Sequence, residues 1–187
     1  QKTQAVVKGN ARLLTVNLQD ELLENTTYSI LFGNAVVDLN EKNPLKNFTF
    51  SFATGPEIDT LQVSGRLLNA ENLEPLPGVV VGLHSNLNDS AISSLQFVRI
   101  AKTDDEGLFN IRNVKAGNNR LYALQDKSRD FIYQPGEEVA FYDSIIVPEV
   151  IVKQQADTLW KDSVTIDTVR YSKNISYLPN DITLKLF

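Results

Sequence analysis

The segment FTFSFAT, residues 48–54, alternates between phenylalanine and small side chains. The same rhythm occurs in LTVNL, residues 14–18, and in YSILF, residues 28–32. A period of two sends successive side chains to opposite faces of an extended chain, whereas an amphipathic helix needs a period near 3.6. Aromatic and β-branched side chains also suit a pleated surface. These segments therefore predict half-buried strands, each with one face toward a core and one face toward water.

The first 55 residues form the first predicted unit. Its strands are expected at residues 4–8, 12–18, 27–32 and 48–54, separated by Gly-Asn, Glu-Asn and Asn-Pro turn signals. One four-stranded sheet leaves an apolar face uncovered. We therefore expect residues 1–55 to be the C-terminal part of a β-sandwich, or to pack on the next unit of the chain. Gly55-Pro56 marks the boundary, because a proline pushes the residue before it out of the helical region.

Residues 56–150 predict a second unit. Short strands recur after turn signals, and this spacing is typical of a β-sandwich of about 100 residues. The expected strands are residues 60–68, 79–84, 96–103, 107–112 and 119–125. Helix signals are poor, so a short helical turn is expected only at residues 137–144 or in the loop after Asn86.

The tail, residues 151–187, is expected to hold a polar loop and further strands. Strand cores appear at residues 145–147, 150–152, 164–166 and 182–184, while 153–163 is polar and is predicted to be a loop or a partly disordered stretch. The chain begins at Gln1 without an initiator Met or an apolar leader, and it ends in Lys-Leu-Phe. These ends favour a processed or excised fragment whose native protein continues.

The composition excludes several kinds of site. The absence of cysteine excludes disulfides, thiolate metal sites and a cysteine nucleophile. A single histidine, His84, excludes a multi-histidine metal centre. A net charge of −5 argues against a nucleic-acid partner, which requires a basic face. No apolar run approaches the ~18 residues of a membrane helix.

The residues do not predict an enzyme. His84 ends an apolar strand, where we expect it to face water, and no strained nucleophile turn accompanies it. Asp104-Asp105-Glu106 could be paired carboxylates for glycosidic chemistry. Adjacent residues in a hairpin turn rarely face each other across a substrate, so a turn role is favoured. No catalytic residue is assigned.

One loop has the spacing of a calcium site. Oxygen-bearing residues fall at positions 1, 3, 5, 9 and 12 of a twelve-residue stretch, and position 7 offers a backbone carbonyl. The candidate ligands are Asp126, Ser128, Asp130, Ile132, Gln134 and Glu137. Against Ca²⁺, Phe131 occupies the position that needs glycine, and two basic residues reduce the local negative charge. The alternative is a solvated loop with internal salt bridges.

Two segments carry a family resemblance. LLENTTYSI (22–30) and FTFSFATG (48–55) resemble the C-terminal half of a bacterial Ig-like domain. VSGR (63–66), PLPGV (75–79) and TDDEGLFNI (103–111) resemble a carboxypeptidase-regulatory-like, or prealbumin-like, Greek-key sandwich. In this order the pair resembles the Ig-like-domain lipoproteins of Bacteroidetes. The resemblance implies an all-β, non-catalytic cell-envelope protein, anchored by lipid through an N-terminal cysteine that this chain lacks.

A short motif resembles the O-glycosylation acceptor of Bacteroidetes surface proteins. Asp followed by Ser or Thr and an apolar residue occurs six times, whereas about one occurrence is expected by chance from this composition. The candidate hydroxyls are Thr60, Ser90, Ser144, Thr158, Ser163 and Thr168. The alternative is that these polar residues simply begin strands after turns.

The sequence favours a non-catalytic structural or protein-interaction module. The resemblance implies a location in the periplasm or at the cell surface, in association with the outer membrane. A protein partner in the cell envelope is expected, and any membrane contact is through an anchor outside this chain. Two alternatives remain open. One is a carbohydrate-binding module with a glycan partner, using an aromatic platform drawn from Trp160, Tyr122, Tyr133, Tyr142 and Phe141. The other is a set of accessory domains of a larger hydrolase.

Overall fold

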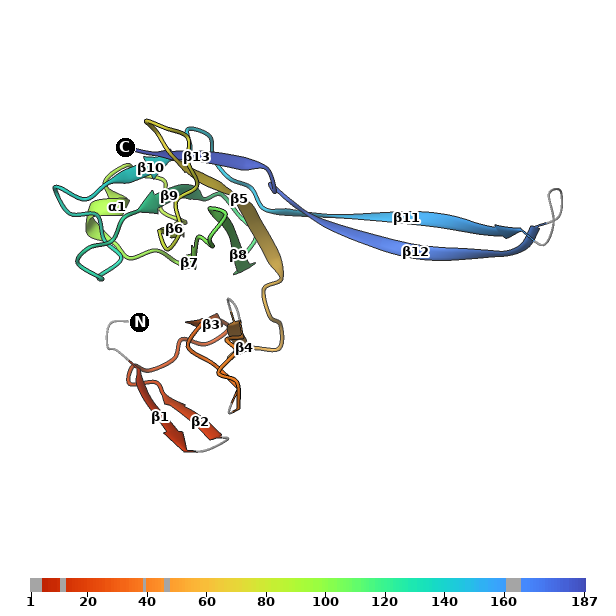
Figure 1. Ribbon diagram of the computed structural model, residues 1–187, viewed down its shortest axis with the longest axis horizontal. Helices are drawn as coiled ribbons and strands as arrows, with labels where there is room; N and C mark the ends of the chain where they lie inside the picture. Colours follow the sequence, from red (N-terminus) through yellow and green to blue (C-terminus); the bar gives the residue numbers. More distant parts are fainter. Residues whose placement is uncertain (1–4, 11–12, 39, 46–47, 161–165) are drawn as a thin grey trace.

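The computed structural model describes residues 5–10, 13–38, 40–45, 48–160 and 166–187 (Figure 1). Thirteen strands and a single short helix, α1 (Ala91–Ser94), make up the regular structure of these residues. The predicted all-β fold class is therefore confirmed. The helix lies in the loop after Asn86, one of the two places where the sequence allowed a helical turn.

The N-terminal unit, residues 5–55, contains two antiparallel hairpins. The first pairs β1 (Val6–Asn10) with β2 (Leu13–Asn17), and the second pairs β3 (Thr27–Gly33) with β4 (Phe48–Ala53). Aromatic rings stack across the second hairpin, with centroids 5.5 Å apart for Tyr28 and Phe52. Such cross-strand pairs fix the register of the hairpin.

The C-terminal unit is a sandwich of a three-stranded and a four-stranded sheet. One sheet has the order β13-β5-β8 and the other the order β10-β9-β6-β7. The strands are β5 (Leu61–Asn69), β6 (Val80–His84), β7 (Arg99–Lys102), β8 (Leu108–Val114), β9 (Arg120–Leu124), β10 (Val139–Phe141) and β13 (Ile182–Leu186). The five strands expected between residues 60 and 125 are all present.

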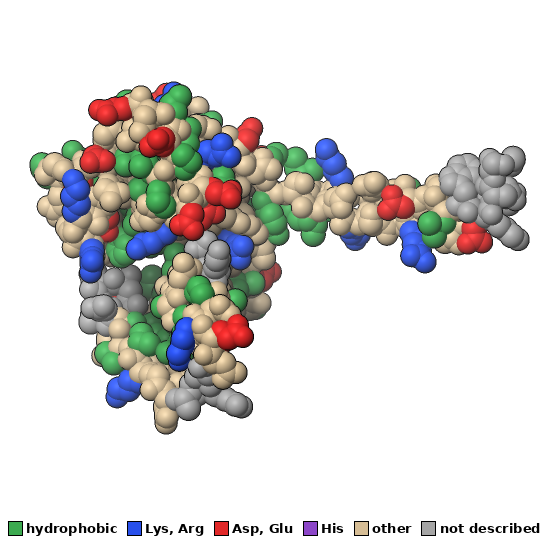
Figure 2. All heavy atoms as spheres, viewed as in Figure 1, with side chains coloured by type: hydrophobic (Ala, Val, Ile, Leu, Met, Phe, Trp, Pro, Cys, Tyr) green, Lys and Arg blue, Asp and Glu red, His purple; other side chains and the backbone are tan. Residues whose placement is uncertain are grey.

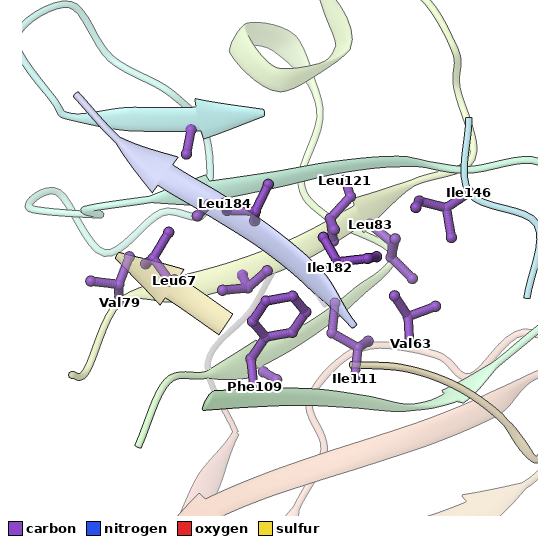
Figure 3. Close-up of a cluster of buried hydrophobic side chains, with 14 of the residues drawn as sticks. Val63, Leu67, Val79, Leu83, Phe109, Ile111, Leu121, Ile146, Ile182 and Leu184 are labelled. Atoms are coloured by element: carbon purple, nitrogen blue, oxygen red, sulfur yellow. The ribbon is translucent and has the colours of Figure 1, made fainter. Parts of the chain in front are cut away.

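The hydrophobic core lies between these two sheets (Figure 3). Val63 and Leu67 from one sheet and Leu83 and Leu121 from the other are fully buried. Phe109 lies among them. Alternation explains the arrangement, because β13 and residues 108–112 of β8 alternate strictly between buried and exposed side chains.

The last strand, β13, completes this core. It runs parallel to β5, and its side chains Ile182, Leu184 and Leu186 are buried. The backbones approach closely at Gly65, where an added Cβ would collide with the carbonyl group of Ile182. Residues 182–186 therefore belong physically to the C-terminal unit, although the sequence placed them in a separate tail.

The predicted loop at residues 153–163 is wrong over its described part. Residues up to 160 continue β11 (Glu149–Trp160), which pairs along its whole length with β12 (Ile166–Leu178). Residues 161–163 lie outside the described part of the chain. The two strands form a long hairpin that extends away from the sandwich (Figure 1). Polar composition misled the prediction, because a ribbon exposed on both faces needs few buried side chains.

Candidate functional site

The two units meet at Arg99, the first residue of β7. Its Nη2 donates a hydrogen bond of 2.6 Å to the carbonyl of Thr27 in the N-terminal unit. Its Nε donates one of 2.7 Å to the carbonyl of Asn113, and Nη2 lies 3.7 Å from the carboxylate of Asp59. One guanidinium thus connects the N-terminal unit, the linker and the C-terminal unit, which suits its planar array of donors.

Asn113 forms the second half of this junction. Its φ of 57° lies in the left-handed region, which asparagine tolerates better than most residues. Its Oδ1 accepts hydrogen bonds from Ser51 Oγ at 2.7 Å and from Ser29 Oγ at 3.4 Å. Its Nδ2 donates to the carbonyl of Asp59 at 2.8 Å. The side chain therefore joins β3, β4 and the linker to the end of β8.

Burial affects the electrostatics of the junction. Desolvation lowers the pKa of Arg99 below its ordinary value, while the carboxylate of Asp59 and the nearby Tyr28 oppose this change. Arginine stays protonated near neutral pH despite such a shift. The junction therefore holds a partly buried cation whose donors meet carbonyl and carboxylate oxygens.

A cleft of about 1980 Å³ lies between the units. The N-terminal unit contributes apolar side chains such as Leu22 and Phe32 to its wall, and the C-terminal unit contributes Phe97 and Arg112. Figure 2 shows the two units in contact and the hairpin as a thin arm to one side. The cleft contains no histidine or cysteine among its described lining residues.

The carboxylates of the 126–137 loop are used by the loop itself. Asp126 Oδ1 accepts the amide of Arg129 at 2.8 Å, and Asp130 Oδ1 accepts the amide of Ile132 at 2.9 Å. Glu137 accepts the amides of Lys127 at 2.8 Å and Gln134 at 3.0 Å. In the described part of the chain, no group of three or more acidic, histidine or cysteine side chains could hold a metal ion. The calcium set stays a prediction, and this hydrogen bonding favours the self-contained loop.

Two of these carboxyl groups have shifted pKa values. The amide of Ile132 is the main cause that lowers the pKa of Asp130. Partial desolvation raises the pKa of Glu137, but the amides of Gln134, Ser128 and Lys127 together lower it below its ordinary value. Both carboxylates are therefore held in the charged form by backbone donors.

The six candidate glycosylation residues differ in exposure. Thr60, Ser90, Ser144 and Thr168 are exposed, and Thr158 is half-buried on β11. Ser163 lies outside the described residues. Modification at these hydroxyls stays a prediction.

His84 is buried, so the prediction that it faces water is wrong. Its side chain is 2% exposed because β6 lies between β7 and β9, and the ring of Phe97 covers it with centroids 4.7 Å apart. Its Nε2 is buried without a hydrogen-bond partner among the described residues, and desolvation lowers its pKa. His84 is therefore a packed, buried side chain and not a solvent-facing one.

Asp104 has the turn role that the sequence favoured. Its Oδ1 accepts the amides of Glu106 at 3.0 Å and Leu108 at 2.8 Å, and Gly107 has a φ of 71°. These bonds close the turn between β7 and β8.

The five aromatic residues considered for a sugar platform do not all share one exposed surface. Tyr122 is 7% exposed in the four-stranded sheet, and Phe141 is 60% exposed on β10. Trp160 ends β11, at the far end of the projecting hairpin (Figure 1).

The sequence analysis did not identify Arg99 and Asn113 as junction residues. No local pattern signals a contact between Arg99 and Thr27, which are 72 positions apart.

No described helix is long and apolar enough to cross a membrane. Residues 1–54 match the family model of the bacterial Ig-like domain. The chain has no match among curated proteins. Among solved structures it is similar to the T6 backbone pilin of serotype M6 Streptococcus pyogenes, described as a modular three-domain structure decorated with variable loops and extensions. The identity is 15% and the TM-score 0.32, over 93% of this chain and 40% of the pilin chain. The N-terminal segment is thus similar to bacterial Ig-like domains, as its sequence predicted.

Proposed function

We propose that this chain is a non-catalytic structural module that holds two β units in a fixed relation. The junction of Arg99 and Asn113 is the observation that carries the proposal. Short hydrogen bonds from Arg99 to Thr27 and from Ser51 to Asn113 cross between the units. Polar groups placed against specific partners set orientation more than they add stability. Such a junction suits a spacer better than a hinge.

The roles of the titratable side chains support a structural function. His84 packs between aromatic rings, and Asp104 closes a turn. Arg99 binds carbonyl groups of the chain itself. A catalytic group must instead lie within hydrogen-bond reach of a substrate.

The similarity of residues 1–54 to bacterial Ig-like domains supports a place at the cell surface or in the periplasm. We extend this proposal to association with the outer membrane through an anchor outside this chain, as the lipoprotein resemblance implies. The expected partner is another protein of the cell envelope. Loops and strand edges offer it backbone groups for pairing.

Distance measurements between spin labels test the fixed relation. The chain has no cysteine, so Glu24→Cys and Glu106→Cys together introduce one labelling site in each unit. We expect a narrow distance distribution that broadens when Arg99→Met is added. Lys185→Met, an exposed change on β13 outside the cleft, serves as the control and leaves the distribution narrow. A broad distribution in the chain with intact Arg99 would refute the spacer role.

A further inference from the structure

The β11–β12 hairpin presents two unpaired strand edges. It forms a sheet of its own, and each strand has its only described strand partner within the hairpin. β11 contributes 12 residues and β12 contributes 13, which is long for a strand edge. Long unpaired edges offer rows of amide and carbonyl groups to another chain. Proteins commonly protect such edges with proline, and none lies within either strand.

The register gives the hairpin one mainly apolar face and one mainly polar face. Directly paired residues share a face, so Val152 lies beside Ile175 and Ala156 beside Tyr171. Val152, Ile175 and Tyr171 are 55%, 58% and 68% exposed. The other face carries Gln155 and Asp157, whose side chains are joined by a hydrogen bond.

The charges on the polar face indicate which chain pairs with the edge of β11. Within β11, Lys153 and Asp157 lie equally far on either side of Gln155. We propose that the β11 edge pairs with β11 of a second copy of this chain, antiparallel and centred on Gln155. Residues 150–160 of the two copies then overlap. Lys153 of each copy lies opposite Asp157 of the other, on one face of the joined sheet.

The neighbouring strands extend this charge complementarity. Asp157 already lies opposite Arg170 in the hairpin. In the joined sheet Asp157 therefore lies between Arg170 of its own copy and Lys153 of the second copy. Ile151 lies opposite Leu159 of the second copy in the same register. Opposite charges and apolar pairs facing each other across strands both stabilise a sheet.

The β12 edge lacks this complementarity. Its charged residues are Asp167, Arg170 and Lys173. The antiparallel register that sets Asp167 opposite Lys173 also sets Arg170 opposite itself, and like charges directly opposite are destabilising. Residues 149–178 together carry four basic and four acidic side chains, so the hairpin has no net charge that would repel a second copy. The pairing is independent of the contacts that join the two units.

Disulfide trapping tests the register. In the proposed dimer the two Gln155 residues lie directly opposite each other, with Cα atoms about 4.5–5.5 Å apart, within the range of a disulfide. Gln155→Cys introduces the only thiol, so we expect a covalent dimer on mild oxidation. Ser172→Cys is the matched control, because Ser172 is the residue of β12 that pairs with Gln155 inside the hairpin and so lies on the opposite edge. Equal trapping of the two variants would overturn the proposed edge.

Charge-reversal variants test the recognition between the two copies. Their self-association is measured by sedimentation velocity across a concentration series. We expect the unaltered chain to show a concentration-dependent dimer, and Lys153→Asp to weaken it at least tenfold. Asp157→Lys alone has the same effect, whereas an equimolar mixture of the two variants restores dimers. Lys173→Asp on β12 is the control and leaves self-association unchanged.

Three outcomes would refute the dimer through β11. One is a monomer at every concentration together with no trapping of Gln155→Cys. The second is a dimer lost in Val152→Asp but unaffected by Lys153→Asp, which would indicate packing through the apolar face. The third is a mixture of charge variants that stays monomeric.

Discussion

Asn113, at the end of β8 in the C-terminal unit, accepts a hydrogen bond of 2.7 Å from Ser51 in β4 of the N-terminal unit. The two residues are 62 positions apart. Asn113 makes this contact in the left-handed conformation, with a φ of 57°. The junction therefore combines an unusual backbone conformation with side-chain chemistry.

Asn113→Gly should loosen the junction. Glycine accepts the positive φ, so the variant isolates the loss of the side-chain bonds to Ser51, Ser29 and Asp59. We expect a loss of about 1–3 kcal/mol in the free energy of unfolding, measured by chemical denaturation. Asn110→Ala, an exposed change on the same strand, should cost less than about 0.5 kcal/mol. Equal effects of the two variants would contradict the assigned role of Asn113.

Gly65→Ala should disrupt the pairing of β13 with β5. The added Cβ meets the backbone of Ile182, which cannot move aside as a flexible side chain can. We expect a loss of about 2 kcal/mol or more in stability, measured by thermal denaturation. Gly9→Ala is the matched control, since open space surrounds the strand residue Gly9. A stable Gly65→Ala variant would show that β13 does not pack as described.

Stability should fall on acidification below pH 6.5 because of His84. Burial lowers the pKa of His84 in the folded state, so the unfolded state binds the proton more readily. The contribution of His84 to the free energy of unfolding is complete above the unfolded pKa of about 6.5. It declines as the pH falls below that value, by at most about 1.4 kcal/mol per pH unit. Denaturation of the His84→Leu variant between pH 5 and 8 should lack this decline. The same slope in both proteins would contradict the assignment.

The stability of the 126–137 loop should depend on Glu137 and not on calcium. Glu137→Gln weakens the acceptor for the amides of Lys127, Ser128 and Gln134, so we expect a lower melting temperature. Because the folded pKa values of Glu137 and Asp130 are lowered, their contribution is present above the ordinary carboxyl pKa and is lost as the pH falls through the folded values.

The control for this loop is the unaltered chain titrated with CaCl₂ in a calorimeter. We expect no binding heat and no melting shift with EDTA. A calcium-dependent rise in melting temperature, abolished in Glu137→Gln, would instead establish the cation site that the loop spacing predicts.

The sequence alone determined strands β1 to β9, because strand patterns and turn signals are carried by local residues. The phenylalanines of residues 48–52 and the turn at Asp104 are both local signals, and both were predicted. The burial of His84 was not predictable, because it depends on β6 lying inside the four-stranded sheet beneath Phe97. Strand order is set by contacts between distant residues, which periodicity does not encode.

Tertiary structure also determined how the tail pairs with the sandwich and how the two units are joined. Residues 182–186 have a strand pattern, but only the sandwich shows that they pair with β5. The 153–160 segment is polar and alternates weakly, so its extended form depends on the partner strand across the hairpin. Arg99 and Asn113 are ordinary in the sequence, and they join the two units because folding brings Thr27 and Ser51 to them.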